Sequence, residues 1–310
     1  MTSSPRFLGL DTIMIDVVVK IAALPERGLD EVASGRLVTA GGGFNALSAA
    51  VRQGMAATYL GQLGSGPFAD IARQSLHREG IDAPIPSRSD LDLGLCLVLV
   101  EDDGERTFVT SPGAEGQLRA SELATVEIFA GDVLFMSGYD FVYPEIGGEV
   151  IAWLRTIPEE ALVAFDPGPR VMDIPSKVLE EVFARTDWLL CNAHEAKALA
   201  VDVELTAAAE RLLERTGRVG VVIRDGAEGC HVARRGEETL HVPAVVTEVV
   251  DTNGAGDVHN GVFLAEVSRG VSVLEASRRA NIAASIAIGQ LGPATCPDRA
   301  VVSEALARAY

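Results

Sequence analysis

The sequence predicts an α/β fold in which helices cover both faces of a mainly parallel sheet, together with a small second sheet. Three observations support this. Short apolar runs alternate with longer stretches of helical periodicity, the pattern of repeated βαβ units. The chain has 310 residues, enough to bury a large core. Two further segments read as β-ribbon joined by turns, which a βαβ alternation does not explain.

The elements of the core follow from local patterns. Short continuous apolar runs are typical of strands buried on both faces, and apolar residues recurring three and four positions apart indicate helices. The predicted core strands are Arg6–Leu10, Ala57–Leu60, Val133–Ser137, Leu162–Asp166, Trp188–Cys191 and Gly220–Arg224. The predicted helices are Phe44–Gln53, Ala69–Glu79, Gly147–Thr156, Ser176–Ala184, Glu195–Ala200, Leu205–Thr216 and Val273–Leu291, with another running from about Asp257 to Gly270.

The small sheet is predicted from the segments Asp16–Ile21, Leu95–Glu101 and Arg106–Val109. Asp102–Glu105 reads Asp-Asp-Gly-Glu, a strong hairpin signal. We interpret residues 12–38 and 94–111 as lid segments inserted in the α/β core. The alternative, that they are peripheral strands of the main sheet, stays open. No repeat, low-complexity tract or linker interrupts the chain, so residues 1–310 are predicted to form a single domain.

Composition and charge exclude several classes of function. Lys and Arg number 26 against 44 Asp and Glu, a formal net charge of −18. Sequence-independent nucleic-acid binding depends on phosphate neutralisation, so we expect no nucleic-acid partner. The four widely spaced cysteines form no C-x-x-C pair, which argues against a zinc site and a disulfide framework. Neither a signal peptide nor a membrane-spanning run is present, which predicts a cytoplasmic protein with no membrane partner.

The segment Asp251–Asp257, Asp-Thr-Asn-Gly-Ala-Gly-Asp, is the most informative. Its small residues let the backbone N–H groups of Gly254, Ala255 and Gly256 converge at a helix N-terminus, which favours an anion. Asp257 places a carboxylate beside that point, and phosphoryl transfer to an alcohol needs both donors and a base. The helix dipole favours an acid in the first turn even without chemistry, so this segment alone does not decide.

A second glycine cluster, Gly41-Gly42-Gly43, opens a predicted helix and is followed by Phe44 and Asn45. The glycines allow close backbone approach and positive φ, and the Asn45 amide can both donate and accept hydrogen bonds. This suits a polyhydroxylated ligand. A flexible loop capped by Asn45 is an equally good explanation of the motif taken alone.

Five motifs together resemble the signatures of the ribokinase-like (PfkB) carbohydrate kinase family. In chain order they are Gly41–Ala46, the glycine–alanine turn Pro112–Ala114, the N-x-x-E element Asn192–Glu195, the G-x-x-G nucleotide loop in Arg224–Gly229, and Asp251–Asp257. The similarity runs from about Gly9 to Cys296. Each motif is weak alone, but five in the order and spacing of the family are a specific signal.

The resemblance implies a fold, a reaction and a set of site residues. The fold would be a ribokinase-like three-layer α/β/α core with a small β-sheet lid, and the reaction the ATP-dependent phosphorylation of an alcohol. Asp257 would be the base, and the amides of Gly254, Ala255 and Gly256 the anion hole. The helix terminus should lower the pKa of Asp257. The remaining implied residues are Asp16, Gly41, Gly42 and Asn45 for sugar hydroxyls, Asn192 and Glu195 for Mg²⁺ and its waters, and Arg224, Gly226, Gly229 and Asn281 for the nucleotide.

Several positions depart from the family pattern or extend it. Arg224 stands where a small or hydroxylated residue is more common, and it could hold phosphates or pair with Asp225. His259 stands near the catalytic turn, where a packed or solvated histidine is the more frequent outcome. Some relatives bind a monovalent cation beside the anion hole. Asp251, with the Asn253 carbonyl and the Leu291–Gly292 turn, is the candidate for K⁺.

The substrate is the most open question. Asp166-Pro167-Gly168-Pro169-Arg170 resembles an element of relatives that act on keto-sugars and sugar acids, in which Arg170 could bind a carboxylate; pairing of Arg170 with a nearby acid is an equal alternative. Tyr139, Asp140 and Tyr143 follow a predicted strand and could line the same cleft.

Few aromatic residues lie near the glycine cluster, which favours a ribose- or ketose-like sugar and its hydroxymethyl group. A nucleoside kinase, a 2-keto-3-deoxy sugar acid kinase and a non-catalytic binding relative remain alternatives. A dinucleotide-binding oxidoreductase ranks last, because no G-x-G-x-x-G follows the first strand. The apolar face of the lid could form a homodimer.

Overall fold

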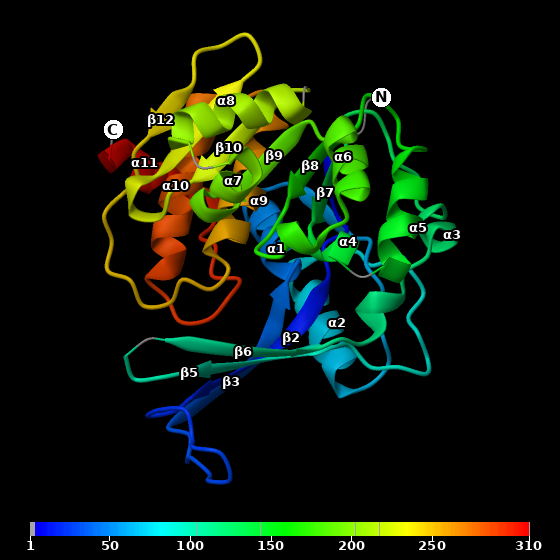
Figure 1. The fold of residues 1–310 in the computed structure, drawn as a ribbon, viewed down its shortest axis with the longest axis vertical. Helices are drawn as coiled ribbons and strands as arrows, with labels where there is room; N and C mark the ends of the chain where they lie inside the picture. Colours follow the sequence, from blue (N-terminus) through cyan, green and yellow to red (C-terminus); the bar gives the residue numbers. More distant parts are fainter. Residues whose placement is uncertain (1–3, 104, 143, 202, 217, 310) are drawn as a thin grey trace.

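The structure is a computed structural model that describes residues 4–103, 105–142, 144–201, 203–216 and 218–309. A large α/β core lies at the top of Figure 1, and a separate small sheet lies below it. The predicted fold class is therefore confirmed. Among the described residues, no helix has both the length and the apolar character needed to cross a bilayer.

The main sheet has eight strands within the described residues, in the order β12-β11-β10-β9-β8-β7-β1-β4. Their bounds are β1 (Arg6–Gly9), β4 (Ala56–Tyr59), β7 (Val133–Ser137), β8 (Leu162–Asp166), β9 (Trp188–Asn192), β10 (Gly220–Arg224), β11 (Cys230–Arg234) and β12 (Leu240–Val242). The pairs β10–β11 and β11–β12 are antiparallel and the others parallel. The prediction missed β11 and β12, because these strands at one edge lack a continuous apolar run.

Helices cover both faces of this sheet and give the three-layer arrangement. One face carries α1 (Phe44–Arg52), α2 (Pro67–Glu79), α9 (Ala255–Val267), α10 (Val273–Ile288) and α11 (Arg299–Ala309). The other carries α3 (Ala120–Leu123), α4 (Tyr139–Val142), α5 (Pro144–Leu154), α6 (Ser176–Arg185), α7 (Ala193–Ala200) and α8 (Leu205–Thr216). Short 3₁₀ turns stand at Ala114–Gln117, Val171–Asp173 and Gly226–Glu228.

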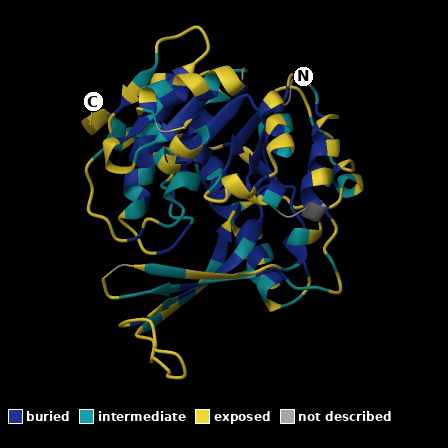
Figure 2. Cartoon of the chain, in the orientation of Figure 1, coloured by how far each residue is buried: buried dark blue, intermediate teal, exposed yellow. Residues whose placement is uncertain are grey.

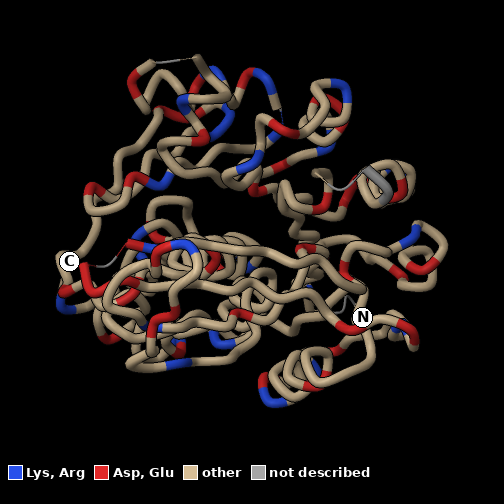
Figure 3. The backbone as a smooth tube through the Cα atoms, turned by 60° about the horizontal axis from the view of Figure 1, so that its bottom comes forward, with Lys and Arg blue, Asp and Glu red and all other residues tan. Residues whose placement is uncertain are grey.

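The core consists of two apolar clusters, one on each face of the sheet. Successive strand residues point to opposite faces, so Phe7 of β1 belongs to one cluster and Leu8 to the other. Figure 2 shows the strands buried between helices whose outer faces are exposed. In Figure 3, positions of acidic and basic residues are spread over the backbone trace of the described residues.

The small sheet, which we call the lid, has the strand order β3-β2-β5-β6. Its strands are β2 (Ile13–Lys20), β3 (Gly35–Gly42), β5 (Leu95–Val100) and β6 (Arg106–Ser111). The alternative that these strands belong to the main sheet is wrong. β3 was not predicted because its glycines and polar residues give no strand signal, yet it pairs with β2 along its whole length. Glu101 N–H donates to the Glu105 carbonyl across the hairpin, at 3.0 Å; Gly104 lies outside the described residues.

Close packing of α1 against α9 brings the two glycine motifs together. Gly261 of α9 faces α1, where an added Cβ would lie 2.5 Å from the Ala46 carbonyl oxygen and 2.7 Å from the Ala49 Cβ. Only glycine permits this approach. The N-termini of both helices therefore lie at the same end of the sheet, where Asn45 meets Asp257.

Candidate active site

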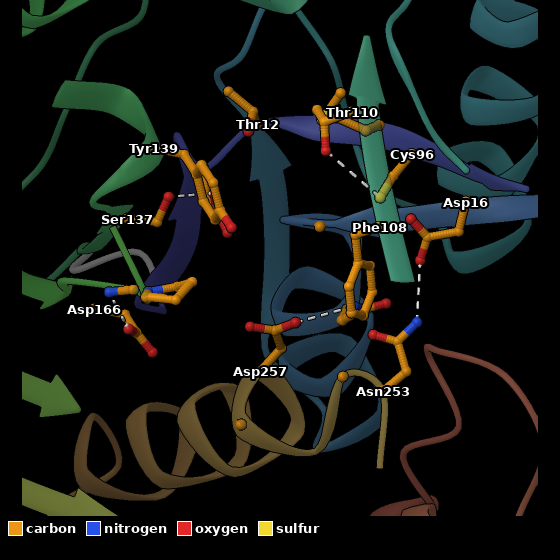
Figure 4. A pocket seen from close by; sticks show the side chains of 18 of the residues that line it. Thr12, Asp16, Cys96, Phe108, Thr110, Ser137, Tyr139, Asp166, Asn253 and Asp257 are labelled. Carbon is orange, nitrogen blue, oxygen red and sulfur yellow. Dashed lines mark hydrogen bonds between the residues drawn. The ribbon is translucent and has the colours of Figure 1, made fainter. Parts of the chain in front are cut away.

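Two cavities meet at the N-terminus of α9. The first, of about 320 Å³, lies between the lid and the carboxyl ends of the core strands (Figure 4). The second, of about 470 Å³, lies between the Gly226–Gly229 turn, residues 244–249, and helices α9 and α10. Arg224 and Gly256 line both cavities. Ligand sites of open α/β sheets occur at this edge of the sheet.

The turn before α9 has the conformation that the sequence indicates. Gly254 caps the helix with φ of 75°, a left-handed value that favours glycine. The Ala255 N–H donates to the Thr252 carbonyl oxygen at 3.3 Å, whereas the N–H groups of Gly254 and Gly256 have no protein acceptor among the described residues. These two amides, rather than all three, are free to bind an anion.

Asp257 stands in the first turn of α9 and lines the first cavity. The Asn45 Nδ2 donates to its Oδ2 at 2.9 Å, which links the two signature motifs directly. Burial raises the pKa of Asp257 to about 6, although the Asn45 hydrogen bond opposes that rise. The expectation of a lowered pKa is therefore wrong, because desolvation of the carboxyl outweighs the stabilising contacts.

The lid contributes Asp16, a residue that is 8% exposed and whose carboxylate accepts a hydrogen bond from Asn253 Nδ2 at 3.2 Å (Figure 4). Burial raises the pKa of Asp16 to about 6. Gly41 makes room for this carboxylate, since an added Cβ would lie 2.3 Å from Asp16 Oδ2. Gly42, with φ of 59°, lines the cavity itself. Gly41 thus leaves room for the Asp16 side chain, and direct binding of sugar hydroxyls by Gly41 stays a prediction.

Arg224 ends β10 and is held by two partners from other elements. Its Nη2 lies 3.0 Å from Asp166 Oδ2 at the end of β8, and its Nη1 donates to Asn260 Oδ1 in α9. Asn260 Nδ2 in turn donates to Asp166 Oδ2 at 2.7 Å. Burial lowers the pKa of Arg224, but Asp166 and Glu195 outweigh it, so the pKa is raised and the charge is kept. The partner of Arg224 is therefore Asp166 and not Asp225.

Asn192 and Glu195 form a capping box at the start of α7. The Glu195 N–H donates to Asn192 Oδ1 at 2.9 Å, and the Asn192 N–H donates to Glu195 Oε2 at 2.8 Å. The N-x-x-E spacing of Asn192 and Glu195 therefore stabilises the N-terminus of α7, whether or not these residues also bind a ligand. Burial, followed by the Asp166 carboxylate, raises the pKa of Glu195 to about 7. A cation beside Glu195 would stabilise its ionised form, which fits a Mg²⁺ held through water.

The second cavity collects the residues predicted to bind the nucleotide. Asn192, Gly226, Gly229 and Asn281 line it together with Arg224. The Asn281 amide donates to the carbonyl oxygens of Val242 and Pro243 at 2.9 and 3.1 Å.

No group of three or more His, Cys, Asp or Glu side chains that could hold a metal appears among the described residues.

His259 lies inside the protein, 3% exposed, with Nε2 at 3.1 Å from Asn281 Oδ1. Burial lowers the pKa of His259 to about 3, so the ring is neutral and packed, as the more frequent outcome predicted. Because the Asn281 Nδ2 donates elsewhere, its Oδ1 accepts from the histidine N–H.

Arg170 does not line the first cavity, although Gly168 and Pro169 do. Its Nε lies 2.8 Å from Asp173 Oδ2, and both side chains are 54% exposed. Arg170 thus pairs with a neighbouring acid, as the alternative interpretation predicted. Binding of a substrate carboxylate by Arg170 stays a prediction. Tyr143 lies outside the described residues.

Aromatic residues gather in the cleft although they are scattered in the sequence. Phe108 from the lid, Phe135 and Tyr139 line the first cavity, and Figure 4 shows the rings of Phe108 and Tyr139. Phe44, by contrast, is 5% exposed and belongs to the core. The argument that the site lacks aromatic residues is therefore wrong, because strands distant in sequence deliver them.

Sequence reasoning missed Asp11 at the carboxyl end of β1. Ser137 joins Asp11 to Asp140, which was predicted to lie near the cleft. Ser137 Oγ donates to Asp11 Oδ1, and the Ser137 N–H donates to Asp140 Oδ2 at 2.9 Å. Burial raises the pKa of Asp11, and it raises the pKa of Asp140 to about 7. A carboxylate just after a predicted strand is the signal that could have found Asp11.

Asp251 occupies the turn between the lid and α9, but it lines neither cavity. Arg106 of the lid lies 2.6 Å from its Oδ1, and the Asn253 N–H donates to the same atom at 2.9 Å. The Gly292 N–H donates to Oδ2 at 2.9 Å. The Asp251 carboxylate, predicted to bind K⁺, therefore accepts hydrogen bonds from a guanidinium group and two backbone N–H groups.

A helix N-terminus with free amides, a carboxylate beside it and a cavity on each side defines the class of small-molecule kinases that phosphorylate an alcohol. Comparison with known proteins gives the family. The model described as "pfkB family carbohydrate kinase" matches residues 7–300, and the chain belongs to this family.

Individual relatives agree with this assignment. The uncharacterised sugar kinase YegV of Escherichia coli is 32% identical over 304 residues, which cover 96% of this chain and 93% of that protein. The solved structure of ribokinase from Thermotoga maritima has a TM-score of 0.82 at 26% identity, covering 98% of this chain and 99% of that one. Adenosine kinase from Sinorhizobium meliloti shares the fold, with a TM-score of 0.85 at 23% identity and coverage of 98% and 99%.

Proposed function

We propose that this carbohydrate kinase transfers the γ-phosphoryl group of ATP to a hydroxymethyl oxygen of a ribose- or ketose-like sugar, with Asp257 as the base. One observation carries the proposal: the two cavities meet at Gly256 and Arg224, with the Asp257 carboxylate on the lid side of that junction. The ribokinase name of the Thermotoga maritima relative supports a ribose-like substrate.

The sugar would bind in the first cavity. Asp16 and Asn45 supply acceptors and a donor for its hydroxyls, and Gly42 lets the backbone approach. With a pKa of about 6, Asp257 is mostly ionised at pH 7 and can accept the hydroxyl proton. As the oxygen attacks phosphorus, the proton passes to Asp257, and the bond from phosphorus to the ADP oxygen breaks.

The nucleotide would bind in the second cavity. The Gly226–Gly229 turn and Asn281 border its nucleoside part, and the fixed charge of Arg224 faces the phosphates at the junction. The free amides of Gly254 and Gly256 form the anion hole for the transferred group. Mg²⁺ bound near Asn192 and Glu195 would neutralise phosphate charge. The lid excludes water that would otherwise hydrolyse ATP.

A nucleoside kinase is the second candidate, because Phe108 and Tyr139 give the first cavity two aromatic walls. Aromatic faces stack on a nucleobase, and they also pack on the apolar face of a sugar ring. A sugar acid kinase would need Arg170 to leave Asp173 and turn into the cleft.

The whole chain, residues 1–310, would act as one kinase domain in the cytoplasm, where its four free cysteines stay reduced.

Homodimer formation through the lid is a further part of the proposal. Val38 and Val109 are 42% and 55% exposed. Side chains alternate between the two faces of a sheet, and both valines occupy positions that alternate with those lining the cavity, so they lie on the lid face opposite Phe108. The sedimentation coefficient of Val109→Asp against that of the wild type tests this.

The central test is ADP release measured with pentoses, hexoses, keto-acids and nucleosides. With any accepted substrate, Asp257→Asn should lower kcat about 10³-fold and leave the Kd of ATP within about twofold, because only the base is lost. Asp225→Asn, beside Arg224 but lining neither cavity, is the matched control. Near-wild-type turnover of Asp257→Asn would overturn the base assignment. No turnover with any substrate would favour a non-catalytic sugar- or nucleotide-binding protein.

A further inference from the structure

The carboxylate of Asp251 accepts three hydrogen bonds from the protein. Arg106 Nη2 and the Asn253 N–H donate to Oδ1 at 2.6 and 2.9 Å, and the Gly292 N–H donates to Oδ2 at 2.9 Å. The Asp251 side chain is 9% exposed and that of Arg106 is 23% exposed, so the ion pair is largely shielded from water. Charge-assisted hydrogen bonds of this kind are the stronger class.

These contacts do not fit a monovalent cation at Asp251. The N–H groups of Asn253 and Gly292 take one acceptor position on each carboxylate oxygen, so a cation on Oδ1 would have to take the place of the Arg106 guanidinium. A K⁺ on Oδ1 would also lie within a few ångströms of the Arg106 guanidinium, where like charges repel strongly at low dielectric. Lys20 and Arg36 line the neighbouring cavity together with Asp251 and add to that repulsion.

Arg106 also joins two parts of the protein that must be aligned for transfer. It begins β6, just after the lid hairpin, on the face that carries Phe108, since the two residues are two positions apart. Its Nη1 lies 3.2 Å from Thr252 Oγ1. One guanidinium therefore holds the lid against residues 251 and 252, and the anion-hole turn begins two residues later at Gly254.

We propose that Arg106 supplies the fixed positive charge that the anion-hole turn requires at Asp251, so that this kinase needs no monovalent cation. Arg106 is a positioning residue: it acts on the amides of Gly254 and Gly256 through Asp251 and Thr252. The inference rests on the proposed kinase function. It adds that the positive charge of Arg106 comes from the lid and contacts Asp251 when the lid is closed.

The test compares KCl with choline chloride at equal ionic strength. Wild-type kcat should agree within about twofold in the two salts, because no cation site is open. Arg106→Ala should lose about tenfold in choline chloride and recover at least about fivefold in KCl, since K⁺ can then enter beside Asp251. Its Tm should likewise be higher in KCl than in choline chloride of equal ionic strength, whereas the wild-type Tm should agree in the two salts, because a ligand of the folded state stabilises it.

Two variants separate the charge at Asp251 from other effects. Arg106→Lys keeps the charge and should stay independent of K⁺. Arg36→Ala removes a cation from the same sheet that makes no ion pair with Asp251, and it should behave as the wild type. Activation of the wild type by K⁺ would overturn the proposal, as would an Arg106→Ala protein whose activity and Tm both ignore K⁺. The Tm measurement decides even if no substrate is turned over, so the proposal can fail independently of the kinase assignment.

Discussion

The two cavities that meet at Arg224 are built in different ways. The first is lined by carboxylates from distant parts of the chain, with Asp11, Asp166 and Glu195 following three core strands and Asp16 coming from the lid. The second is lined mainly by glycines, small residues and apolar side chains of the Gly226–Gly229 turn, residues 244–249 and helices α9 and α10. The first cavity thus presents ionisable side chains to a ligand, and the second presents mainly backbone atoms and apolar side chains.

This difference indicates a division of labour. A site that accepts hydroxyl protons needs carboxylates whose pKa lies near the working pH, and burial provides this for Asp257 and Asp16. A site that holds a nucleotide needs close backbone approach and little added negative charge. Arg224 belongs to both cavities, so changes at this residue and on either side of it should separate the two functions.

Among the changes that compare the two cavities, the largest effect is expected at Arg224. Arg224→Met should lower kcat/KM about 10²-fold for both sugar and ATP, because it removes a fixed cation at the transfer point. The variant also leaves the Asp166 carboxylate buried without its ion pair, so its Tm must be measured alongside. Arg234→Met, which removes a surface arginine paired with Glu237, is the control and should change kcat/KM less than about twofold. An effect on only one substrate would show that Arg224 serves one cavity.

The cavity that we propose for the nucleotide was easier to predict from sequence than the one that we propose for the sugar. The Gly226–Gly229 turn and the segment Asp251–Asp257 are contiguous, and positive φ or helix capping demands glycine at fixed positions within them. Asn45 was found because its motif also begins a helix. These features follow from local backbone geometry, which short stretches of sequence encode.

The acidic cluster and the aromatic walls could not be predicted in the same way. Asp11 and Phe108 reach the first cavity from different sheets, and only the topology places them together. The ion pair between Arg106 and Asp251 joins residues 145 positions apart. The raised pKa of Asp257 likewise depends on burial by the folded chain, which a helix dipole argument leaves out.

The pH dependence should separate the acidic cavity from the other one. Burial raises the pKa of Asp257 to about 6, so the base becomes protonated and inactive as the pH falls through that value. Below the apparent pKa, kcat/KM for the sugar should fall about tenfold per pH unit. ATP binding should change much less at saturating Mg²⁺, which keeps the Glu195 carboxylate ionised although burial raises its pKa to about 7. His259, with a pKa lowered to about 3, stays neutral throughout.

Asp16 shares a raised pKa of about 6, so the acid limb reports a macroscopic value for the two carboxyls. Asp16→Asn removes one of them and should keep the acid limb, with a higher KM for the sugar. A profile that stays flat to pH 4.5 in a folded wild-type protein would contradict the assignment of an ionised Asp257.

A smaller effect is expected at the aromatic wall of the lid. Phe108→Ala should raise the KM of the sugar about fivefold, the equivalent of about 1 kcal/mol of lost aromatic contact, with kcat nearly unchanged. The KM of ATP should not change, since Phe108 lines only the first cavity. Val109→Ala is the matched control on the opposite face of the same strand. An equal rise in both KM values would mean that the lid covers both cavities.

The smallest effect is expected at Arg170, which tests how far the first cavity extends. Arg170 and Asp173 form an exposed pair three residues apart, and such pairs contribute little to stability. Arg170→Ala should therefore change kcat/KM less than about twofold for neutral sugars, with an unchanged Tm. If the protein accepts a sugar acid, and Arg170→Ala lowers kcat/KM for it more than about tenfold while sparing the neutral analogue, then Arg170 exchanges Asp173 for the substrate carboxylate. The acidic cavity, bounded here by Gly168 and Pro169, would then extend to Arg170 when a substrate carboxylate binds.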